Sequence, residues 1–525
     1  MPKTRPLRTR FAPSPSGDLH LGNARAALFN WLAARRGGGE MILRIEDTDA
    51  ARASSRRAAA IADDLRWLQL DWAGAPRRQS ENAPRHARAL QALARDGFAY
   101  PCFCAPEMLR AEREEMLRQG RPPRYSGRCA GLPAAQTAAR IQNGEAAAVR
   151  FRMPRREIAF EDAARGAMHF CGADIGDFIL QRADGGFSFF FANAVDDAAD
   201  EITLVLRGED HLSNTPRQLA ILAALNMPAP VYGHLPLMLA PGGGPLSKRA
   251  GSLSLRDLRA QGFLPAALQN YLARAGCAIG ADELLSAAEL AAAFSLSAVS
   301  KSSSAFDEAQ LLHWQKRAAQ NLTAALRETW LARAFASPEN SADLDSAKLE
   351  SKTDSNAAAT PAKLESVLES IPESKSELAS ESESETESEN IKPENEKSAA
   401  ALPPKPRQWA AFCEAVRGNT ALFADARQWA EIIENAPPAA EKAQNAIAEA
   451  GADFYRAAAA AVREDMEWAA FCKRVSAATN RKGRALFLPL RAALTGRADG
   501  PEMPPLFKLI GAKKAKLRLQ NAQIL

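Results

Sequence analysis

The residues with the clearest chemical character lie near the start of the chain, in the stretch RFAPSPSGDLHLGN, residues 10–23. Its prolines and glycines favour a turn and let the backbone approach a ligand closely. The next segment, ARAALFNWLAARRGG, has the pattern of a helix, and helix N-termini bind anions through free N–H groups. His20 lies directly before this helix and could donate a hydrogen bond to a phosphate oxygen. Because no Gly-Lys-Ser/Thr follows, the stretch is not a Walker loop, and alone it is equally compatible with a simple connection.

A second candidate is the basic stretch PLSKR, residues 245–249, which follows PGGG. Glycines make this segment flexible, and a mobile basic loop can close on a polyphosphate and stabilise charge on a leaving pyrophosphate. Lys248 and Arg249 would supply that charge. The alternative is a basic surface turn, and five residues by themselves do not decide between the two.

Length and charge narrow the class of protein. The 525 residues are too many for one core and indicate several domains. The formal net charge is +5, but residues 341–400 carry −9, which leaves +14 on the rest. A basic body of this kind indicates a polyanionic partner. The seven cysteines favour reduced thiols, and no apolar run has the length of a signal peptide or membrane span. We therefore expect a soluble cytoplasmic protein with no membrane contact.

The order of patterns along the chain predicts its organisation. Residues 1–100 alternate strand-like segments, RTRFAP and EMILRIED, with helical segments at 23–36 and 54–72, and this rhythm returns over 201–255. Such an order is typical of a doubly wound sheet, which binds ligands at the carboxyl ends of its strands. Residues 101–200 have the character of an insertion, whereas 256–336 and 406–525 are helical in pattern. The glutamate-rich segment 337–405 is predicted to be a disordered insert in an exposed loop.

Four stretches occur together in one order: RFAPSPSGDLHLGN, RIEDTDAAR, VLRGEDHLSNTPRQ and PLSKRAG. In this order they resemble class I aminoacyl-tRNA synthetases, and among these the glutamyl-tRNA synthetases. The stretches LPAALQNYLARAG and GRALFLPLRAALTGRADGPEMPPLFKLIG are also similar to that family. The resemblance covers nearly the whole chain outside 337–405. It implies a Rossmann-like catalytic domain (1–100 and 201–255), an inserted acceptor-stem-binding subdomain with a zinc knuckle (101–200), a helical stem-contact domain (256–336) and a helical anticodon-binding domain (406–525).

The resemblance also implies a reaction, in which ATP and L-glutamate form glutamyl-adenylate and the glutamyl group then passes to the terminal adenosine of tRNA. His20 and Lys248 match the catalytic positions of the family's HIGH and KMSKS motifs, and Mg²⁺ is expected with ATP. The positions that match the ATP site are His20, Gly22, Asn23, Asp210, His211, Ser247, Lys248 and Arg249. The positions that match the glutamate site are Arg10, Ala12, Ser14, Glu46, Phe189, Asn193 and Arg207. Arginines suit the two carboxylates of glutamate, and Glu46 suits its ammonium group.

Three positions depart from the family pattern. Phe189 stands where tyrosine is common, which removes one hydrogen bond to the substrate. Pro245 replaces the first lysine of the KMSKS-type motif. Gly131 stands where the family's zinc site has histidine, so that Cys102, Cys104 and Cys129 lack their usual fourth ligand. Zinc remains an open question, with Tyr125 or water as the fourth ligand in one reading and three free thiols in the other.

Several alternatives to a tRNA(Glu) ligase remain open at this stage. A non-discriminating or tRNA(Gln)-specific enzyme would share every motif, because the choice depends on a few anticodon-facing side chains. A glutamyl-queuosine tRNA synthetase would have Tyr125 and Cys129 in the observed spacing, but such enzymes lack a C-terminal anticodon-binding domain. A catalytically weak tRNA-binding paralogue is suggested by Phe189 and Pro245 and opposed by His20 and Lys248. A monomer is the default expectation.

Overall fold

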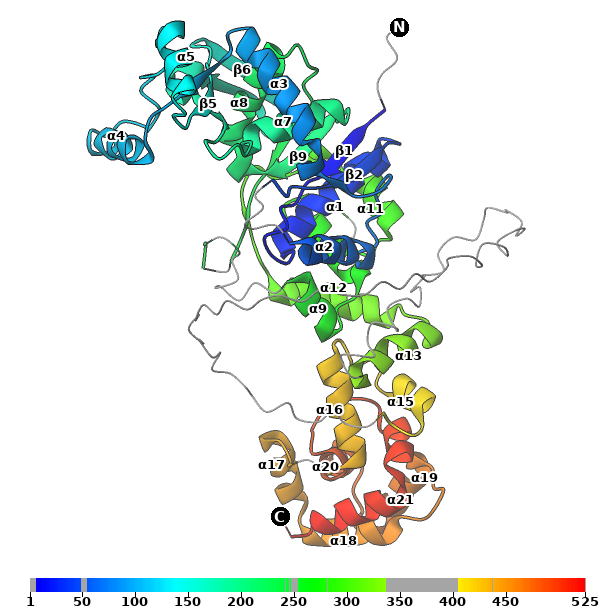
Figure 1. Cartoon of the computed structure of the whole chain (residues 1–525). Coiled ribbons are helices and arrows are strands. Elements are labelled where there is room, and N and C mark those ends of the chain that lie inside the picture. The colour runs from blue at the N-terminus through cyan, green and yellow to red at the C-terminus, as the bar shows by residue number, and fades with distance from the viewer. Residues whose placement is uncertain are drawn as a thin grey trace, which may run out of the picture. The chain divides into compact units, whose positions relative to one another are not determined.

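The computed structural model describes residues 6–48, 54–240, 242–244, 246, 254–280, 282–336, 405–436 and 438–524 (Figure 1). Two predictions fall on residues outside these ranges: the acidic insert up to residue 404 and the basic loop residues 247–249. The described chain forms two compact units, the first running to Asn321 and including Arg417–Phe423, the second holding the remaining C-terminal residues.

Parallel strands dominate the first unit. One sheet has the order β1-β2-β3 with parallel pairing, and a second has the order β7-β6-β10-β9, in which only the β6–β7 pair is antiparallel. The Thr203 N–H donates to the Arg8 carbonyl at 2.9 Å, which joins the two sheets at the β1 and β9 edges. The strands are β1 (Arg8–Phe11), β2 (Glu40–Ile45), β3 (Arg77–Arg78), β6 (Glu157–Asp162), β7 (Gly166–Cys171), β9 (Leu204–Gly208) and β10 (Val231–Leu235).

The predicted strand EMILRIED and the predicted first helix are both observed. In β2 every residue after Glu40 is buried, as expected for a parallel strand covered on both faces. The helix α1 (Leu21–Arg36) packs against β1, β2 and β9. His20 caps it, because its Nδ1 accepts the Gly22 N–H at 3.1 Å while the Asn23 side chain accepts the His20 N–H. The opening loop is therefore held against the sheet.

The second predicted helix is shorter than its pattern suggested. The apolar spacing predicted a helix over 54–72, but α2 (Ser55–Trp67) ends earlier. Gln69 takes a left-handed conformation with φ of 58°, and the Leu70 N–H donates back to the Leu65 carbonyl at 2.9 Å. This closing bond is that of a Schellman motif, which satisfies the last carbonyls of the helix. Glycine or asparagine at position 69 would have predicted this helix end, because both readily adopt the left-handed conformation, whereas glutamine does not.

Residues 99–200 contribute to two sheets. β4 (Ala99–Cys102), β5 (Ala148–Phe151) and β8 (Phe178–Gln181) form an antiparallel sheet, whereas β6 and β7 join β10. Helix α7 (Phe189–Ala199) then brings several buried polar side chains beside the strands of the first unit. The other helices between residues 83 and 224 are α3 (Ala83–Arg95), α4 (Pro106–Arg118), α5 (Ala134–Gln142), α6 (Gly172–Ile175) and α8 (Thr215–Ala224).

The remainder of the described chain is almost entirely helical, as its sequence pattern predicted. The first unit ends with β11 (Met238–Leu239), α9 (Leu255–Gln261), α10 (Pro265–Arg274), α11 (Ala287–Ala293), β12 (Ser304–Ala305) and α12 (Glu308–Gln320). The second unit contains α13 (Ala324–Ala332), α15 (Trp409–Ala415), α16 (Phe423–Glu434), α17 (Glu441–Ala450), α18 (Ala452–Ala461), α19 (Trp468–Thr479), α20 (Arg484–Thr495) and α21 (Met503–Asn521). Within the described residues no helix combines the length and apolarity that crossing a membrane requires.

Candidate active site

A pocket of about 920 Å³ opens where β1, β9 and the start of α1 meet. It brings together most of the site residues expected from sequence. Those that line it are Arg10, Ala12, Ser14, His20, Gly22, Asn23, Glu46, Phe189, Asn193, Arg207, Asp210 and His211. Ser247, Lys248 and Arg249 lie outside the described residues. The pocket is large enough for a nucleotide with a second small ligand.

The cap at the start of α1 defines the tautomer of His20. Because Nδ1 accepts a hydrogen bond from the Gly22 N–H, the proton of a neutral imidazole resides on Nε2. A Cβ atom on Gly22 would come within 3.0 Å of the His20 ring, so a larger residue here would require the ring to shift. In this arrangement the donor of a neutral His20 ring is Nε2–H rather than Nδ1–H.

Arg207 is the most fully organised cation of the pocket. Its Nη2 donates to Gln218 Oε1 at 2.6 Å and to Thr215 Oγ1 at 2.9 Å, and its Nε donates to His234 Nε2 at 3.2 Å. Among the described residues Nη1 is buried without a hydrogen-bond partner. Burial lowers the pKa of Arg207 to about 10, so it is still a cation at neutral pH. A buried donor without a partner costs free energy, and an anionic ligand would satisfy it.

Arg10 belongs to a buried ion cluster behind the pocket. Its Nε donates to Asp197 at 3.1 Å, and Asp197 also accepts from Arg44 at 2.6 Å. Burial would raise the pKa of Asp197, but Arg10 and Arg44 hold it below its usual value. Asp200 accepts from Arg44 on its other side at 3.2 Å. The cluster orients Arg10 by its Nε and balances two cations that burial would otherwise penalise.

Among the described residues Glu46 is the one buried carboxylate that lines the pocket, and it shares a hydrogen-bond chain with Arg207. Asn193 donates to Glu46 Oε1, and Gln218 Nε2 donates to Asn193 Oδ1 at 3.2 Å. Because Gln218 also accepts from Arg207, the anion-binding and cation-binding groups are positioned together. Burial raises the pKa of Glu46 to about 7, although Arg44 and Arg10 oppose the shift.

Sequence reasoning missed Asp197 and Gln218, two residues that orient the pocket. A signal for Asp197 was present, since NAVDDAAD places adjacent acids in an otherwise apolar helical stretch, and buried carboxylates require partners. No comparable signal marked Gln218, whose role depends on the side chains that the fold brings to it. Phe189 lines the pocket with its ring 5.3 Å from that of His211, and it offers no hydroxyl there.

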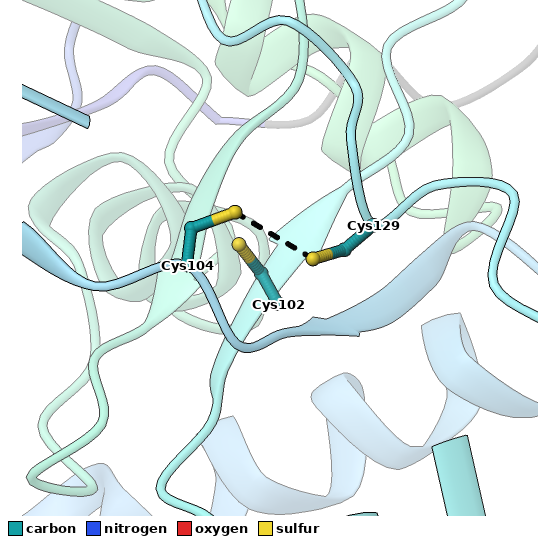
Figure 2. A group of neighbouring side chains, drawn as sticks. All are labelled: Cys102, Cys104 and Cys129. Carbon is teal, nitrogen blue, oxygen red and sulfur yellow. Dashed lines mark hydrogen bonds between the residues drawn. The ribbon is translucent and has the colours of Figure 1, made fainter. Parts of the chain in front are cut away.

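The three cysteines of the predicted knuckle converge next to β4, as Figure 2 shows. Their sulfur atoms all lie within 4.8 Å of one another, with Cys104 and Cys129 at 3.6 Å. Tyr125 Oη lies 3.5 Å from Cys102 Sγ and 3.4 Å from Cys104 Sγ. Tetrahedral zinc with sulfur ligands at about 2.3 Å and an oxygen at about 2.0 Å requires separations of about 3.8 and 3.5 Å. The three sulfur atoms could therefore hold a metal ion, with Tyr125 Oη at the distance from two of them that a fourth ligand requires.

Arg150 provides a positive charge beside this cluster. Its Nε donates to Cys102 Sγ at 3.2 Å, and its guanidinium lies 3.8 Å from the centroid of the Tyr125 ring. Burial would raise the pKa of the Cys102 thiol, but hydrogen bonds from Tyr125 and Arg150 lower it overall. A thiolate is the form that binds a metal.

The fold and pocket define a class, and comparison with known proteins agrees. Residues 6–313 match the family model "tRNA synthetases class I (E and Q), catalytic domain", and residues 389–523 match an "Anticodon binding domain". The parallel sheet, the capped helix beside it and the helical C-terminal region are thus those of a class I tRNA synthetase.

The particular family follows from full-length relatives. The chain is 41% identical over 526 residues to glutamate–tRNA ligase 2 of Acidithiobacillus ferrooxidans, covering 98% of this chain and 96% of that one. It is 40% identical to glutamate–tRNA ligase 2 of Nitrosococcus oceani, with 98% of each covered. The chain belongs to the glutamate–tRNA ligase family. The crystal structure of the glutamate–tRNA synthetase from Elizabethkingia anophelis shares the fold, with a TM-score of 0.77 at 24% identity, covering 99% of this chain and 100% of that one.

Proposed function

We propose that this protein charges tRNA with L-glutamate in two steps, through glutamyl-adenylate and with release of pyrophosphate. The observation that carries the proposal is the presence, in one pocket, of a buried carboxylate and of a buried arginine whose Nη1 has no partner among the described residues. Glutamate has two carboxylates and one ammonium group, which these groups complement. Membership of the glutamate–tRNA ligase family supports the same substrate.

The amino acid would be bound at the β1 and β9 end of the pocket. Arg207 and Arg10 would receive its carboxylates, while Glu46 would receive its ammonium group. Ala12 and Ser14 of the opening loop would line the same binding site, and Asn193 would hold Glu46 in place by its hydrogen bond. Because each charged group is held by neighbours before the substrate arrives, little reorganisation is needed on binding.

ATP would occupy the part of the pocket nearest α1. The His20 Nε2–H would donate to a phosphate oxygen, with Gly22, Asn23, Asp210 and His211 lining the seat. Ser247, Lys248 and Arg249 would approach from the basic loop, and Lys248 would stabilise the charge on the α-phosphate as pyrophosphate leaves. When bound, Mg²⁺ supplies further neutralisation of the phosphates. Positioning and charge stabilisation, rather than covalent catalysis, would carry the rate.

The remaining domains would bind tRNA. We propose that residues 101–200 bind the acceptor stem, that 256–336 form a helical stem-contact domain, and that 406–525 bind the anticodon. The basic charge outside the acidic segment supports a polyanionic partner. We also propose that the enzyme acts as a monomer in the cytoplasm.

The test of function is charging of separated tRNAs. Purified protein with ATP and radiolabelled L-glutamate should aminoacylate tRNA(Glu). Charging of both tRNA(Glu) and tRNA(Gln) would identify a non-discriminating enzyme, and charging of tRNA(Gln) alone a tRNA(Gln)-specific one. Lys248→Ala should abolish tRNA-dependent pyrophosphate exchange, because the loop then lacks its transition-state charge. Absence of exchange with every tRNA would instead support a non-catalytic tRNA-binding role.

We further propose that the cysteine cluster holds zinc through Cys102, Cys104, Cys129 and Tyr125. The purified protein is expected to contain about one zinc per chain, and Cys129→Ser to lose most of it. Cys171 is exposed and outside the cluster, so Cys171→Ser is the matched control and should retain the metal. Inductively coupled plasma mass spectrometry measures both, and less than about 0.2 equivalents in the wild type would contradict the site.

Glutamate binding should weaken as pH falls through 7. Glu46 attracts the ammonium group only when ionised, and its pKa is raised to about 7. Above that pH the carboxylate is charged and affinity is highest, whereas below it the affinity should fall by up to about tenfold per pH unit. The KM for glutamate between pH 6 and 8 tests this expectation. Glu46→Gln should bind weakly with a flat profile, and an unchanged slope in that variant would assign the titration to another group.

A further inference from the structure

We propose that Asp162 and His234 form a positioning pair that holds Arg207 in its glutamate-binding orientation by fixing the tautomer of His234. The proposal rests on the assignment of Arg207 to the glutamate site. Neither Asp162 nor His234 lines the pocket, and neither was singled out by the sequence motifs. Their contacts with each other and with Arg207 carry the inference.

Asp162 is anchored at the end of β6 by its two oxygens, which have different partners. Oδ1 accepts the backbone N–H groups of Ala164 and Arg165 at 3.0 Å each, and that of His234 at 3.1 Å. Oδ2 accepts from His234 Nδ1 at 2.5 Å. Three backbone donors therefore require an acceptor at the Oδ1 position, while Oδ2 is committed to the imidazole.

His234 transmits this arrangement to Arg207. It lies on β10 directly beside Arg207 of β9 in the parallel register, and it is fully buried. Because Nδ1 donates to Asp162, Nε2 of the neutral ring is an acceptor, and it receives the Arg207 Nε–H at 3.2 Å. Thr215 Oγ1 lies 3.0 Å from the same nitrogen. Burial lowers the pKa of His234 despite the opposing effect of Asp162, which agrees with a neutral ring.

The consequence for Arg207 is a defined orientation of its planar guanidinium. His234 holds Nε, and Thr215 with Gln218 holds Nη2, so that in the described structure only Nη1 has no partner. A guanidinium fixed along two of its three nitrogens has little freedom to rotate, and this preorganisation lowers the entropic cost of binding a carboxylate. Reversal of the His234 tautomer would place an N–H against the Arg207 Nε–H.

Asp162→Asn creates that reversal with almost no change of shape. The three backbone donors require the amide oxygen at the Oδ1 position, which puts the amide NH₂ group opposite His234 Nδ1. Nδ1 must then accept, so the ring proton moves to Nε2 and faces Arg207. We expect the KM for glutamate to rise by at least about tenfold, as is typical when a residue that orients a binding group is replaced, with the KM for ATP within about twofold of wild type.

The matched control is the second buried His–Asp pair of the same unit. His86 Nε2 lies 3.0 Å from Asp196 Oδ1, and neither residue lines the pocket. Asp196→Asn makes the same exchange in a buried His–Asp pair that does not contact Arg207, and it should leave the KM for glutamate unchanged. A conservative exchange gives a second check: His234→Gln keeps one donor and one acceptor, and should preserve glutamate binding better than His234→Leu.

The tautomer itself is measured by ¹⁵N NMR of histidine-labelled protein, in which only six histidines contribute and His234→Gln assigns the signal. We expect an Nδ1-protonated neutral ring in the wild type and an Nε2-protonated ring in Asp162→Asn. A wild-type ring protonated on Nε2, or a glutamate KM unchanged by Asp162→Asn, would overturn the proposal. The NMR measurement does not depend on catalysis. If the wild-type protein charged no tRNA with glutamate, the proposed function would be refuted, but the tautomer of His234 could still be determined.

Discussion

Arg207→Ala is expected to reduce the affinity for glutamate by roughly 30- to 5,000-fold, which corresponds to the loss of about 2–5 kcal/mol typical of a buried charged hydrogen-bond partner. Of the described arginines that line the pocket, Arg207 is the one with a guanidinium nitrogen, Nη1, that is buried without a partner. Removing it also leaves Gln218 Oε1 without its 2.6 Å donor. The KM for ATP should change little, because the proposed phosphate contacts lie at His20 and in the basic loop.

The KM for glutamate and the KM for ATP in tRNA charging measure this expectation. Arg217 of α8 is a suitable control, since it bonds to the Ser213 carbonyl, packs over the rings of Phe178 and Phe190, and does not line the pocket. Arg217→Ala should leave the KM for glutamate unchanged. Arg207→Lys keeps the positive charge but loses the planar guanidinium with its several N–H donors, so we expect a loss of glutamate affinity smaller than that of Arg207→Ala. A KM for glutamate within threefold of wild type in Arg207→Ala would remove this residue from the site.

Asp197→Ala is expected to destabilise the first unit by about 3–5 kcal/mol, since it leaves two buried arginines without their shared carboxylate. Among the described residues Asp197 is the one ion-pair partner of Arg10, whereas Arg44 retains Asp200 at 3.2 Å. Side chains of Arg44 and Asp197 have no exposed surface, so water cannot compensate. Arg10 should also lose its orientation, with a rise in the KM for glutamate.

Urea unfolding, followed by tryptophan fluorescence, measures the loss of stability. The exposed ion pair of Arg456 and Asp453, with 2.7 Å between Nη1 and Oδ1, is the control for the buried cluster. Asp453→Ala should not shift the unfolding midpoint measurably, because solvent screens such pairs. Equal effects of the two substitutions would mean that the buried cluster contributes no more than a surface pair.

The short motifs made the site predictable from the sequence. RFAPSPSGDLHLGN, RIEDTD and RGEDH each lie at the end of a strand, and parallel strands bring such ends to one edge of the sheet. The structure accordingly places Arg10, His20, Glu46 and Arg207 in one pocket. The helical pattern of the last third and the convergence of Cys102 with the other cysteines were also accessible, since both depend on local periodicity or spacing.

Other features depended on partners that are distant in the chain. Asp197 meets Arg10 across 187 residues, and Asp162 meets His234 across 72. The local sequence around either acid does not predict its partner, because a buried carboxylate can accept a hydrogen bond from any donor that the fold brings near it. The end of α2 was also not predictable, because the left-handed conformation of Gln69 that closes its Schellman motif is not signalled by a glutamine.

The sequence by itself therefore determined the class of fold and predicted which charged residues share one pocket, because these depend on residue types and on strand-end positions. Only the tertiary structure decided how those groups are held: His20 through the Gly22 amide, Arg10 through Asp197, and Arg207 through a chain of buried polar side chains. Orientation is set by hydrogen bonds between segments far apart in the chain, and such bonds are defined only when the chain has folded.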